Sequence, residues 1–441
     1  MSAILDVLLL TAPPPRPLMS RINKIMPPLG LGYLATYLKQ ANYSVKIIDL
    51  HFGNNNVNNV LSVLREYKTR LVGISCTTET YNTAIRLAKI IKEECKDCVI
   101  VFGGPHVSFE YASTLNHDQI NFVVLNEGEI SLKRLCDYCI SGIGSLEQLK
   151  GIAYKKNGVI VCAEPEPFIQ DLDILPFPDR KLFDNLHSYA APASIITSRG
   201  CPGQCIFCAA SVLSGGRYRM RSANNIVSEF EYLKSLGFNH VHIADDTMTA
   251  NIKRLHEILD ALLSRNLQMS WYCESRVDVL SKDILIKMKA AGLTYIQVGV
   301  ESGNQMMLDN MKKNITLEQI RKVFMWCREL GISTVTNLIL GLPSDNNETV
   351  QDNMNMIEEL MSLGVLSSFT ICTPFPGTPI WLKPDEFEVE FVEHNLDYYN
   401  LFYPVIKTNH FSSTEIRNIY YYATKKVYGL RSEKYLSSQL P

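Results

Sequence analysis

The sequence predicts a two-part α/β protein, with a doubly wound parallel sheet followed by a partial (β/α)6 barrel and a small helical C-terminal segment. Three observations lead to this fold class. Short apolar runs alternate with helical patterns almost throughout the chain, which is typical of parallel sheets covered by helices. A proline-rich and acidic stretch at 164–190 interrupts the alternation once. The chain has 441 residues, which is too long for one ordinary hydrophobic core.

The first part of the chain, residues 1–145, carries five predicted strands. Each is a short apolar run bounded by glycine, proline or polar residues, and the five lie at 4–11, 44–49, 71–76, 98–103 and 121–125. Between them, apolar residues recur with helical spacing at 28–41, 56–68, 80–95 and 129–140. Because the connections between parallel strands are helical, we expect helices on both faces of this sheet.

A hairpin and a linker are expected at 146–190. Asn157 and Gly158 separate two β-rich runs and favour the positive φ angles of a two-residue hairpin turn. The stretch 164–190 combines several prolines with acidic residues, and we expect it to be an ordered linker.

The alternation resumes in the second part of the chain, residues 191–384. Six predicted strands lie at 194–199, 239–244, 269–274, 294–300, 333–340 and 366–372. Predicted helices lie between them at 222–236, 251–265, 281–291, 316–330 and 347–363. Six such units indicate an incomplete barrel rather than one of eight units. Residues 385–441 are rich in aromatic side chains, and we expect a helical cap with a helix at 413–427 that borders the substrate or packs on the barrel.

Composition excludes several classes of function. The net charge is −2, which gives no global reason to bind nucleic acid or an anionic membrane face. No stretch reaches the roughly 18 apolar residues of a membrane span, and the N-terminal apolar run is too short for a secretory signal. We therefore expect a soluble, cytoplasmic protein. In that reducing compartment the twelve cysteines are free thiols or metal ligands rather than disulfides.

Three cysteines carry the strongest chemical signal. Cys201, Cys205 and Cys208 lie within eight residues, in a loop with two glycines directly after the first barrel strand, at the end where barrel active sites lie. Thiolates hold iron–sulfur clusters, usually four to a cubane. Three local ligands would leave one iron open for another molecule. A zinc site is the alternative, but no nearby histidine supplies a fourth ligand.

This loop resembles the CxxxCxΦC signature of the radical S-adenosylmethionine superfamily, with Phe207 in the aromatic place. Similar elements follow at the ends of later strands, over roughly residues 190–380. The resemblance implies a [4Fe–4S] cluster on the three cysteines and S-adenosylmethionine contacts from Phe207, Asp245, Arg276, Glu301 and Leu340. Arg276 would meet the methionyl carboxylate with two hydrogen bonds, and Glu301 would accept from the ribose or the amine. Ordinary ion pairing at the barrel rim stays an alternative for Arg276 and Asp245.

The strand ends of the first part suggest a second ligand site. Open parallel sheets bind ligands beyond the carboxyl ends of their strands, and this sheet has neither a GxGxxG motif nor a P-loop. The segment 27–34 and the later Gly103-Gly104-Pro105-His106 resemble the cobalamin-binding domain that precedes the barrel in one class of radical enzymes. That resemblance, over residues 1–140, implies a Rossmann-like domain of the cobalamin-binding type, with contacts from Thr11, Pro13, Ser75, Thr77, Gly103, Gly104, Glu127 and Gly128.

Two histidines and four cysteines near this site are expected to have other roles. Asp49-Leu50-His51-Phe52-Gly53 is one residue short of the cobalt-binding DxHxxG motif and follows the second strand instead of the first. We therefore do not expect His51 to bind cobalt, and we expect His106 to form a loop hydrogen bond. The remaining CxxC pairs are expected to be buried thiols: Cys95 with Cys98, and Cys136 with Cys139.

Both resemblances together imply a cobalamin-dependent radical S-adenosylmethionine enzyme. Such an enzyme cleaves S-adenosylmethionine reductively and most often methylates an unactivated carbon or phosphorus of a small-molecule or peptide precursor. The implied cofactors are a [4Fe–4S] cluster, S-adenosylmethionine and cobalamin, with an electron donor such as flavodoxin or ferredoxin. A cyclase or rearrangement enzyme without methyl transfer is the first alternative, and a non-catalytic cobalamin-binding protein is the second. No acid–base or nucleophile triad is evident, so no catalytic residue is assigned.

Overall fold

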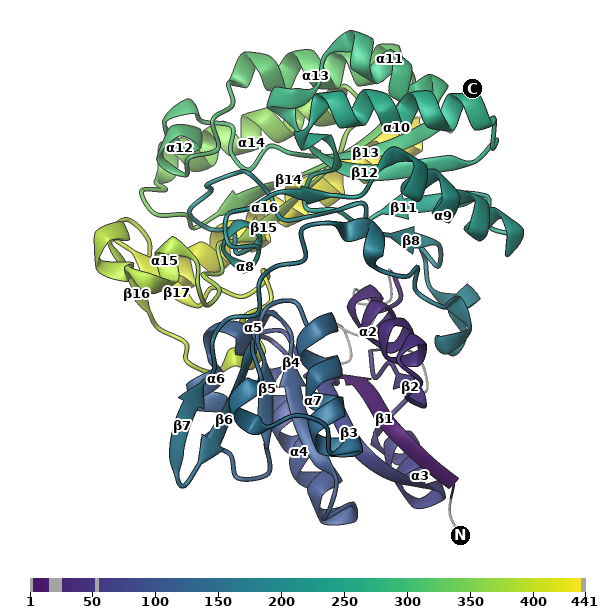
Figure 1. The fold of residues 1–441 in the computed structure, drawn as a ribbon. Helices are drawn as coiled ribbons and strands as arrows, with labels where there is room; N and C mark the ends of the chain where they lie inside the picture. The colour runs from purple at the N-terminus through teal and green to yellow at the C-terminus, as the bar shows by residue number, and fades with distance from the viewer. Residues whose placement is uncertain (1–2, 16–25, 52–54, 438–441) are drawn as a thin grey trace. The chain divides into compact units, whose positions relative to one another are not determined.

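The computed structural model describes residues 3–15, 26–51 and 55–437. It divides into two compact units, Met1–Ser194 and Ile195–Pro441. Figure 1 shows that each unit combines a central sheet with helices. The fold class predicted from the sequence is confirmed in both units.

The first unit is built on a seven-stranded sheet in the order β2-β1-β3-β4-β5-β6-β7. The first five strands are parallel: β1 (Ala3–Thr11), β2 (Val45–Ile48), β3 (Tyr67–Ser75), β4 (Val99–Gly103) and β5 (Phe122–Val124). The hairpin of β6 (Ile152–Lys156) and β7 (Val159–Cys162) pairs antiparallel with β5. It therefore extends the sheet instead of standing apart from it.

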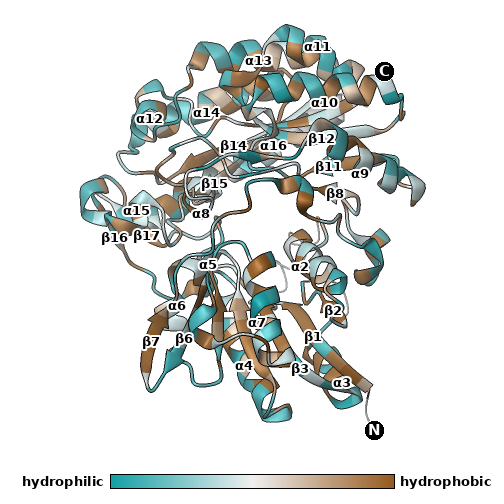
Figure 2. Ribbon diagram, viewed as in Figure 1, coloured by the Kyte–Doolittle hydropathy of each residue, from teal (hydrophilic) through white to brown (hydrophobic). Residues whose placement is uncertain are grey.

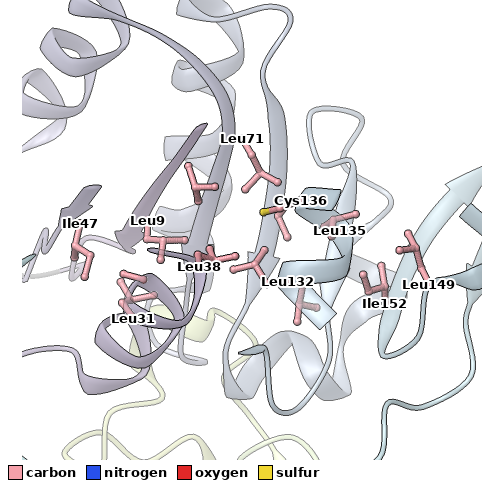
Figure 3. Close-up of a cluster of buried hydrophobic side chains, with 14 of the residues drawn as sticks. Leu9, Leu31, Leu38, Ile47, Leu71, Leu132, Leu135, Cys136, Leu149 and Ile152 are labelled. Carbon is pink, nitrogen blue, oxygen red and sulfur yellow. The ribbon is translucent and has the colours of Figure 1, made fainter. Parts of the chain in front are cut away.

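Helices cover the sheet of the first unit. They are α2 (Leu29–Gln40), α3 (Val57–Glu66), α4 (Tyr81–Glu94), α5 (Pro105–Phe109), α6 (Tyr111–Thr114) and α7 (Glu129–Ser141). Side chains of α2 and α7 share one apolar cluster with strands of the sheet, which places both helices on the same face (Figure 3). Leu38, Leu71, Leu135 and Cys136 are completely buried in it. Burying each leucine contributes about 2 kcal/mol to folding.

One predicted boundary in this unit is wrong. The sequence pattern placed a helix at 56–68 and a strand from 71, but α3 ends at Glu66 and β3 begins at Tyr67. Tyr67 is already extended (φ −115°, ψ 142°) and lies opposite Ala3 of β1. Because β1 is nine residues long, it gives the aromatic and β-branched segment after Glu66 a partner for a full-length strand.

The second unit is built on a six-stranded sheet in the order β15-β14-β13-β12-β11-β8. The strands are β8 (Ser194–Ile195), β11 (His240–Ile243), β12 (Ser270–Arg276), β13 (Leu293–Gly299), β14 (Ser333–Leu340) and β15 (Leu366–Ile371). Along β12 to β15, fully buried residues alternate with more accessible ones. One face of this curved sheet is therefore packed, while the other is open for a ligand.

The barrel helices are α9 (Ala223–Ser235), α10 (Ile252–Arg265), α11 (Lys282–Ala290), α13 (Leu317–Glu329) and α14 (Asn347–Ser362). Each lies within one residue of a predicted helix at both ends. Figure 2 shows these helices with mixed hydropathy, as expected for helices with one buried face. Several begin with a side-chain cap, such as the Thr316 and Gln319 capping box of α13.

Several short elements were not predicted. They include α8 (Ala210–Leu213), α12 (Gln305–Asn310), α15 (Pro379–Leu382), and two antiparallel pairs, β9 (Ser198–Arg199) with β10 (Arg219–Met220) and β16 (Val389–Phe391) with β17 (Ile406–Thr408). Single 3-10 turns lie in the proline-rich linker at 172–174, 180–182 and 186–188. Such short elements lack the length that a periodic pattern needs to be recognised.

The long C-terminal helix α16 (Ser413–Ser437) packs on the barrel. Ile416 forms an apolar cluster with Phe411 and with Ile371 of β15. Tyr421 and Tyr422 of the same helix are exposed. Of the two expectations for the aromatic C-terminal segment, this contact supports packing on the barrel. Within the described part of the chain, no helix has the length and apolar character needed to cross a membrane.

Candidate functional site

The three cysteines of the signature lie in the irregular loop between β9 and α8. Cys201, Cys205 and Cys208 are each partly buried. A Cβ atom at Gly203 would lie 3.3 Å from Sγ of Cys201 and 3.9 Å from Sγ of Cys205. The N–H group of Gly203 also points at Sγ of Cys201, at 3.4 Å. The two sulfurs therefore gather around the turn at Gly203, where a larger residue would contact Sγ of Cys201 closely.

The backbone of this loop is held on both sides. Ile206, which is buried between the second and third cysteines, donates its N–H to the carbonyl of Met311 at 3.2 Å. Its carbonyl accepts from the N–H of Ile380 at 3.5 Å. At the start of the loop, Gly200 has φ +88°, and a Cβ there would overlap the carbonyl of Arg217. The loop is thus preorganised before any ligand binds.

The sulfurs lie in a mixed electrostatic environment. Burial raises the pKa of Cys208 to about 11. Burial also raises the pKa of Cys205, while the cations Lys313 and Arg276 oppose this shift. Thiols with raised pKa values lose their protons when a metal binds them, and the two cations favour the thiolate form. Three adjacent thiols with nearby cations fit an iron–sulfur cluster. Within the described residues, no group of three candidate ligand side chains has metal-binding spacing, and the assignment of the cluster to these cysteines stays a prediction.

Asp245 supports the strand that leads into the loop. It follows β11, and its buried carboxylate accepts hydrogen bonds from the N–H and hydroxyl of Thr197, at 2.6 and 2.5 Å, and from the Ser198 hydroxyl at 2.5 Å. These bonds occupy both carboxylate oxygens. The predicted contact of Asp245 with S-adenosylmethionine stays a prediction, and the observed role is to position β9.

Arg276 lies at the end of β12, and two of its three guanidinium nitrogens already donate hydrogen bonds within the protein. Its Nε and Nη2 atoms donate to the carboxylate of Asp278 at 2.9 and 3.1 Å, and Nη2 also donates to the carbonyl of Lys313 at 2.6 Å. The third nitrogen, Nη1, would lie 3.3 Å from a Cβ at Gly203, beside the cysteine loop. A ligand that enters here therefore meets Nη1, and the expected two-bond contact would need this ion pair to open.

Glu301 has an unusual backbone and a buried partner. It lies just after β13 with φ +71°, although it is not glycine. Its N–H and carbonyl bond to β14, at Asn337 and Ile339, and its Oε1 lies 2.7 Å from Nζ of Lys313. A Cβ at Gly299 would lie 2.5 Å from this carboxylate oxygen and 2.8 Å from Nζ. Gly299 therefore makes the space for the ion pair, and the predicted contact of Glu301 with S-adenosylmethionine stays a prediction.

The remaining predicted contacts are Phe207 and Leu340. Phe207 is partly buried within the cysteine loop. Leu340 ends β14 with its side chain fully buried, and its carbonyl accepts from the N–H of Cys372 at 2.8 Å. Gly341 follows with φ +73°, and a Cβ there would lie 2.9 Å from a side-chain carbon of Ile416. The glycine thus serves the packing of α16, which the sequence could not show.

Glu274 was not among the residues predicted to contact a cofactor. It alternates with the buried residues of β12 and so lies on the open face of the sheet. Burial and the neighbouring carboxylates of Asp246, Asp245 and Glu301 raise the pKa of Glu274 to about 7. Perturbed carboxyl groups of this kind are typical of functional sites. The clustering of acids at the ends of three adjacent strands was the available sequence signal.

A pocket of about 230 Å³ lies beside the cysteine loop in the same unit. Ile206 and Met311 line it, together with acidic side chains from the segment before β16. None of the predicted contact residues lines this pocket, so it is distinct from the site described above.

In the first unit, predicted residues at three strand ends lie side by side. The register places Thr11 of β1 opposite Ser75 of β3, and Ser75 opposite Gly103 of β4. Gly104 follows with φ +103°, and a Cβ there would lie 2.6 Å from the carbonyl oxygen of Cys76. The Pro13 carbonyl accepts from the Thr83 hydroxyl at 2.5 Å. These strand ends form one edge of the sheet, as the sequence predicted.

Other predicted residues of this edge have structural partners. The hydroxyl of Thr11 donates to Asp49 at 2.7 Å, and Thr77 bonds to Thr80 through its N–H at 3.0 Å. Glu127 accepts the N–H of Ile169 at 3.0 Å, so its carboxylate ties the linker to the unit. Gly128 precedes α7, where a Cβ would lie 3.0 Å from Leu34. Their predicted contacts with cobalamin stay predictions.

Two histidines lie near this edge. His106 shares a hydrogen bond of 3.2 Å with the hydroxyl of Thr78 and packs on Tyr81, in keeping with the loop role predicted for it. His51 hydrogen-bonds to the backbone of Ala12, and its Nε2 atom is buried without a hydrogen-bond partner. Burial lowers the pKa of His51, so the neutral ring presents an acceptor. An orphaned acceptor beside the end of β1 and a cradle of glycines fit the binding of a large polar cofactor.

In each of the other two cysteine pairs, one thiol is buried and one is partly buried: Cys98 with Cys95, and Cys136 with Cys139. Cys98 is buried and donates its thiol to the carbonyl of Cys95 at 3.0 Å. Cys136 lies inside the apolar cluster of Figure 3. The predicted motif at 49–53 extends beyond His51 outside the described residues.

Comparisons with known proteins agree with this geometry. The radical SAM superfamily profile matches residues 195–357, and the B12 binding domain profile matches residues 15–135. An uncharacterized methyltransferase from Pyrococcus horikoshii is 31% identical over 421 residues, which is 93% of this chain and 90% of the relative. An anaerobic magnesium-protoporphyrin IX monomethyl ester cyclase from Rubrivivax gelatinosus is 28% identical over 86% of this chain and 70% of its own.

A solved structure shares the fold of the whole chain. The radical S-adenosylmethionine methyltransferase TsrM from Kitasatospora setae, with cobalamin and a [4Fe–4S] cluster bound, superposes with a TM-score of 0.74 at 20% identity. The superposition covers 95% of this chain and 85% of the TsrM chain. The family and cofactors predicted from the sequence are confirmed. The chain belongs to the cobalamin-dependent radical S-adenosylmethionine family, and its cofactors are a [4Fe–4S] cluster, S-adenosylmethionine and cobalamin.

Proposed function

We propose that this protein methylates an unactivated carbon or phosphorus centre of a small-molecule or peptide substrate. The observation that carries the proposal is the gathering of Cys201 and Cys205 around Gly203 beside Nη1 of Arg276, at the carboxyl end of a barrel sheet. The similarity to a methyltransferase over 93% of the chain supports transfer of a methyl group.

In this proposal Cys201, Cys205 and Cys208 hold the cluster, and no fourth protein ligand is needed. When bound, the cluster supplies the electron that cleaves S-adenosylmethionine, and cobalamin supplies the methyl group. Nη1 of Arg276 is the free edge for a carboxylate, and Glu301 accepts from hydroxyl or amine groups. Phe207 and the backbone after Leu340 complete the S-adenosylmethionine site, while Asp245 positions the strand before the loop.

For cobalamin, we propose the strand-end edge of the first unit. Thr11, Ser75 and Gly103 lie in register there, and Gly104 keeps the backbone free of side-chain atoms. Pro13, Thr77, Glu127 and Gly128 belong to the loops that shape this edge. His51 offers its unpartnered Nε2 to an amide of the cofactor.

We also propose a cytoplasmic setting with a flavodoxin or ferredoxin as the electron donor. None of the twelve cysteines forms a disulfide in the described structure, which suits a reducing compartment. Nucleic acid is not expected as a partner because the net charge is −2.

The test is anaerobic reconstitution with iron, sulfide and hydroxocobalamin, followed by addition of S-adenosylmethionine carrying a deuterated methyl group. We expect about four irons per chain, bound cobalamin, 5′-deoxyadenosine, and deuterated methyl on cobalamin or product. Replacing the three cysteines by alanine should abolish iron uptake and leave cobalamin bound. Cys162→Ala, at an exposed cysteine, is the matched control and should keep both.

Two results would overturn the proposal. Absence of iron from the oxygen-protected wild type removes its basis. Formation of 5′-deoxyadenosine without any transfer of the deuterated methyl, in the presence of a substrate that is converted, would favour a cyclase, the activity named for the Rubrivivax relative.

A further inference from the structure

Lys313 is a buried lysine that lies between three proposed cofactor-binding residues. It belongs to the turn between α12 and α13, and its side chain is 7% exposed. Its Nζ atom lies 2.7 Å from Oε1 of Glu301. The backbone of the same turn accepts from Arg276 at the carbonyl of Lys313, at 2.6 Å, and from Sγ of Cys205 at the carbonyl of Lys312, at 3.8 Å.

The turn is built to bring this lysine inward. Lys312 and Asn314, on either side of Lys313, both have φ +56°, a left-handed conformation that ordinary residues rarely adopt. Lys312 and Asn314 are exposed while Lys313 is buried. Gly299 leaves the space that the Lys313 ammonium group and the Glu301 carboxylate occupy. An ion pair on the surface needs neither left-handed residues on both sides of the lysine nor a glycine that leaves space for it. These features therefore indicate that the buried position of Lys313 has a role.

Three ionisable side chains lie near the ammonium group of Lys313: Glu301, Cys205 and Arg276. Arg276 is paired with Asp278, and Glu301 is paired with Lys313. The ion pair with Glu301, at 2.7 Å, holds the buried lysine in its charged form. A charged lysine in a low-dielectric setting acts strongly on any anion beside it.

We propose that Lys313 is a positioning residue that fixes Glu301 for S-adenosylmethionine and raises the reduction potential of the cluster at Cys205. The inference rests on the proposed function, since it takes the three cysteines as the cluster ligands. Reduction adds one negative charge to a cluster that is already bound by thiolates. A buried positive charge nearby therefore stabilises the reduced form more than the oxidised form.

The test is a potentiometric titration of the reconstituted protein, followed by electron paramagnetic resonance of the reduced cluster. Lys313→Met should shift the midpoint potential to more negative values, and Lys313→Arg should restore it to near the wild-type value. Lys312→Met is the matched control, because it removes an exposed lysine from the same turn, and it should leave the potential unchanged.

A second readout tests the positioning of Glu301. Addition of S-adenosylmethionine changes the resonance of a cluster with an open iron, and the concentration for half of this change measures affinity. We expect about a tenfold weaker affinity in Lys313→Met, the effect of losing one charge-assisted hydrogen bond. Lys312→Met should bind like the wild type.

The double variant Lys313→Met with Glu301→Gln separates the effect of the lysine charge on the potential from an effect on folding. Removing both partners leaves no unpaired buried charge. The double variant should therefore take up iron and recover part of the potential shift, but its affinity for S-adenosylmethionine should stay weak.

An unchanged potential in Lys313→Met overturns the inference, and so does an equal shift in Lys312→Met. If Lys313→Met fails to assemble the cluster, the double variant is compared with Glu301→Gln alone, and equal midpoint potentials of these two variants overturn the inference. Failure of the wild type itself to bind iron would instead refute the proposed function.

Discussion

The N–H and the hydroxyl of Thr197 both donate to the carboxylate of Asp245, at 2.6 and 2.5 Å. This contact joins the carboxyl end of β11 to the segment that enters the cysteine loop. Ser198 adds a third hydrogen bond, and Arg254 binds the carbonyl and hydroxyl of Thr197 from the other side. The position of the proposed cluster ligands therefore depends on a buried polar network one strand away.

Asp245→Asn should destabilise the second unit and reduce iron uptake. An amide has one acceptor oxygen and leaves buried donors unsatisfied, so we expect a loss of about 2–3 kcal/mol in the free energy of unfolding. Denaturant unfolding of the apoprotein and iron per chain after reconstitution measure the two effects. Asp260→Asn, at an exposed aspartate paired with Lys287, should change neither quantity. Equal stability of the two variants would contradict the role given to Asp245.

Gly299→Ala should weaken S-adenosylmethionine binding without loss of the fold. The new methyl group would lie 2.5 Å from Oε1 of Glu301 and 2.8 Å from Nζ of Lys313, so the ion pair must separate. We expect about a tenfold loss of affinity, measured by equilibrium binding to the reconstituted protein. Gly429→Ala, where an added methyl group meets no atom within 4 Å, should bind normally. Normal binding by Gly299→Ala would show that the ion pair does not serve this site.

Gly104→Ala should abolish retention of cobalamin while the protein still takes up iron. The φ of +103° is unfavourable for alanine, and the methyl group would lie 2.6 Å from the carbonyl oxygen of Cys76. The loop after β4 must therefore move away from the strand-end edge. Absorbance of bound cobalamin after gel filtration measures the loss. Gly158→Ala, in the β6–β7 hairpin turn with φ +82° and no atom within 4 Å, serves as the control. Full retention by Gly104→Ala would place the cobalamin site elsewhere.

Glu274→Gln should remove a pH dependence of stability. The folded-state pKa of Glu274 is raised to about 7 from an ordinary value of 4.5 by burial and neighbouring carboxylates. The folded state thus holds its proton more tightly than the unfolded state. This contribution is fully present below pH 4.5 and is lost as the pH rises through about 7.

The size of the effect follows from the shift. Wild type should lose about 2–3 kcal/mol of unfolding free energy across this range from Glu274, and the glutamine variant should lose correspondingly less. Denaturant unfolding of apoprotein at a series of pH values gives the comparison. Parallel curves for the two proteins would mean that Glu274 titrates normally.

Much of the fold could be predicted because its elements are long and periodic. The six barrel strands and their helices lie within a few residues of their predicted positions, since each buries one apolar face that leaves a regular pattern. The boundary between α3 and β3 was wrong because the partner strand β1, rather than local preference, sets where Tyr67 becomes extended. The short pairs β9–β10 and β16–β17 left no pattern because strands of two or three residues are too short to show one.

Two parts of the candidate site could be predicted: residues that are close together in the sequence, and residues that lie at the ends of neighbouring parallel strands. The three cysteines lie in one loop, and Thr11, Ser75 and Gly103 share an edge because parallel strands end on the same side. Lys313 was missed because its local sequence, next to Lys312 in a polar turn, does not distinguish it from a surface lysine. Asp245 and Glu127 were recognised as important, but their hydrogen-bond partners, Thr197 and Ile169, could not be foreseen.

By itself, the sequence determined the alternation of strands and helices, the three closely spaced cysteines and the sheet edge that we propose for cobalamin. These features depend on periodicity and on adjacency along the chain. Only the tertiary structure decided which polar groups meet: Lys313 with Glu301, Arg276 with the carbonyl of Lys313, and Asp245 with Thr197. Such pairs join different loops, and their distances follow from strand register and turn geometry, which no local pattern of residues encodes.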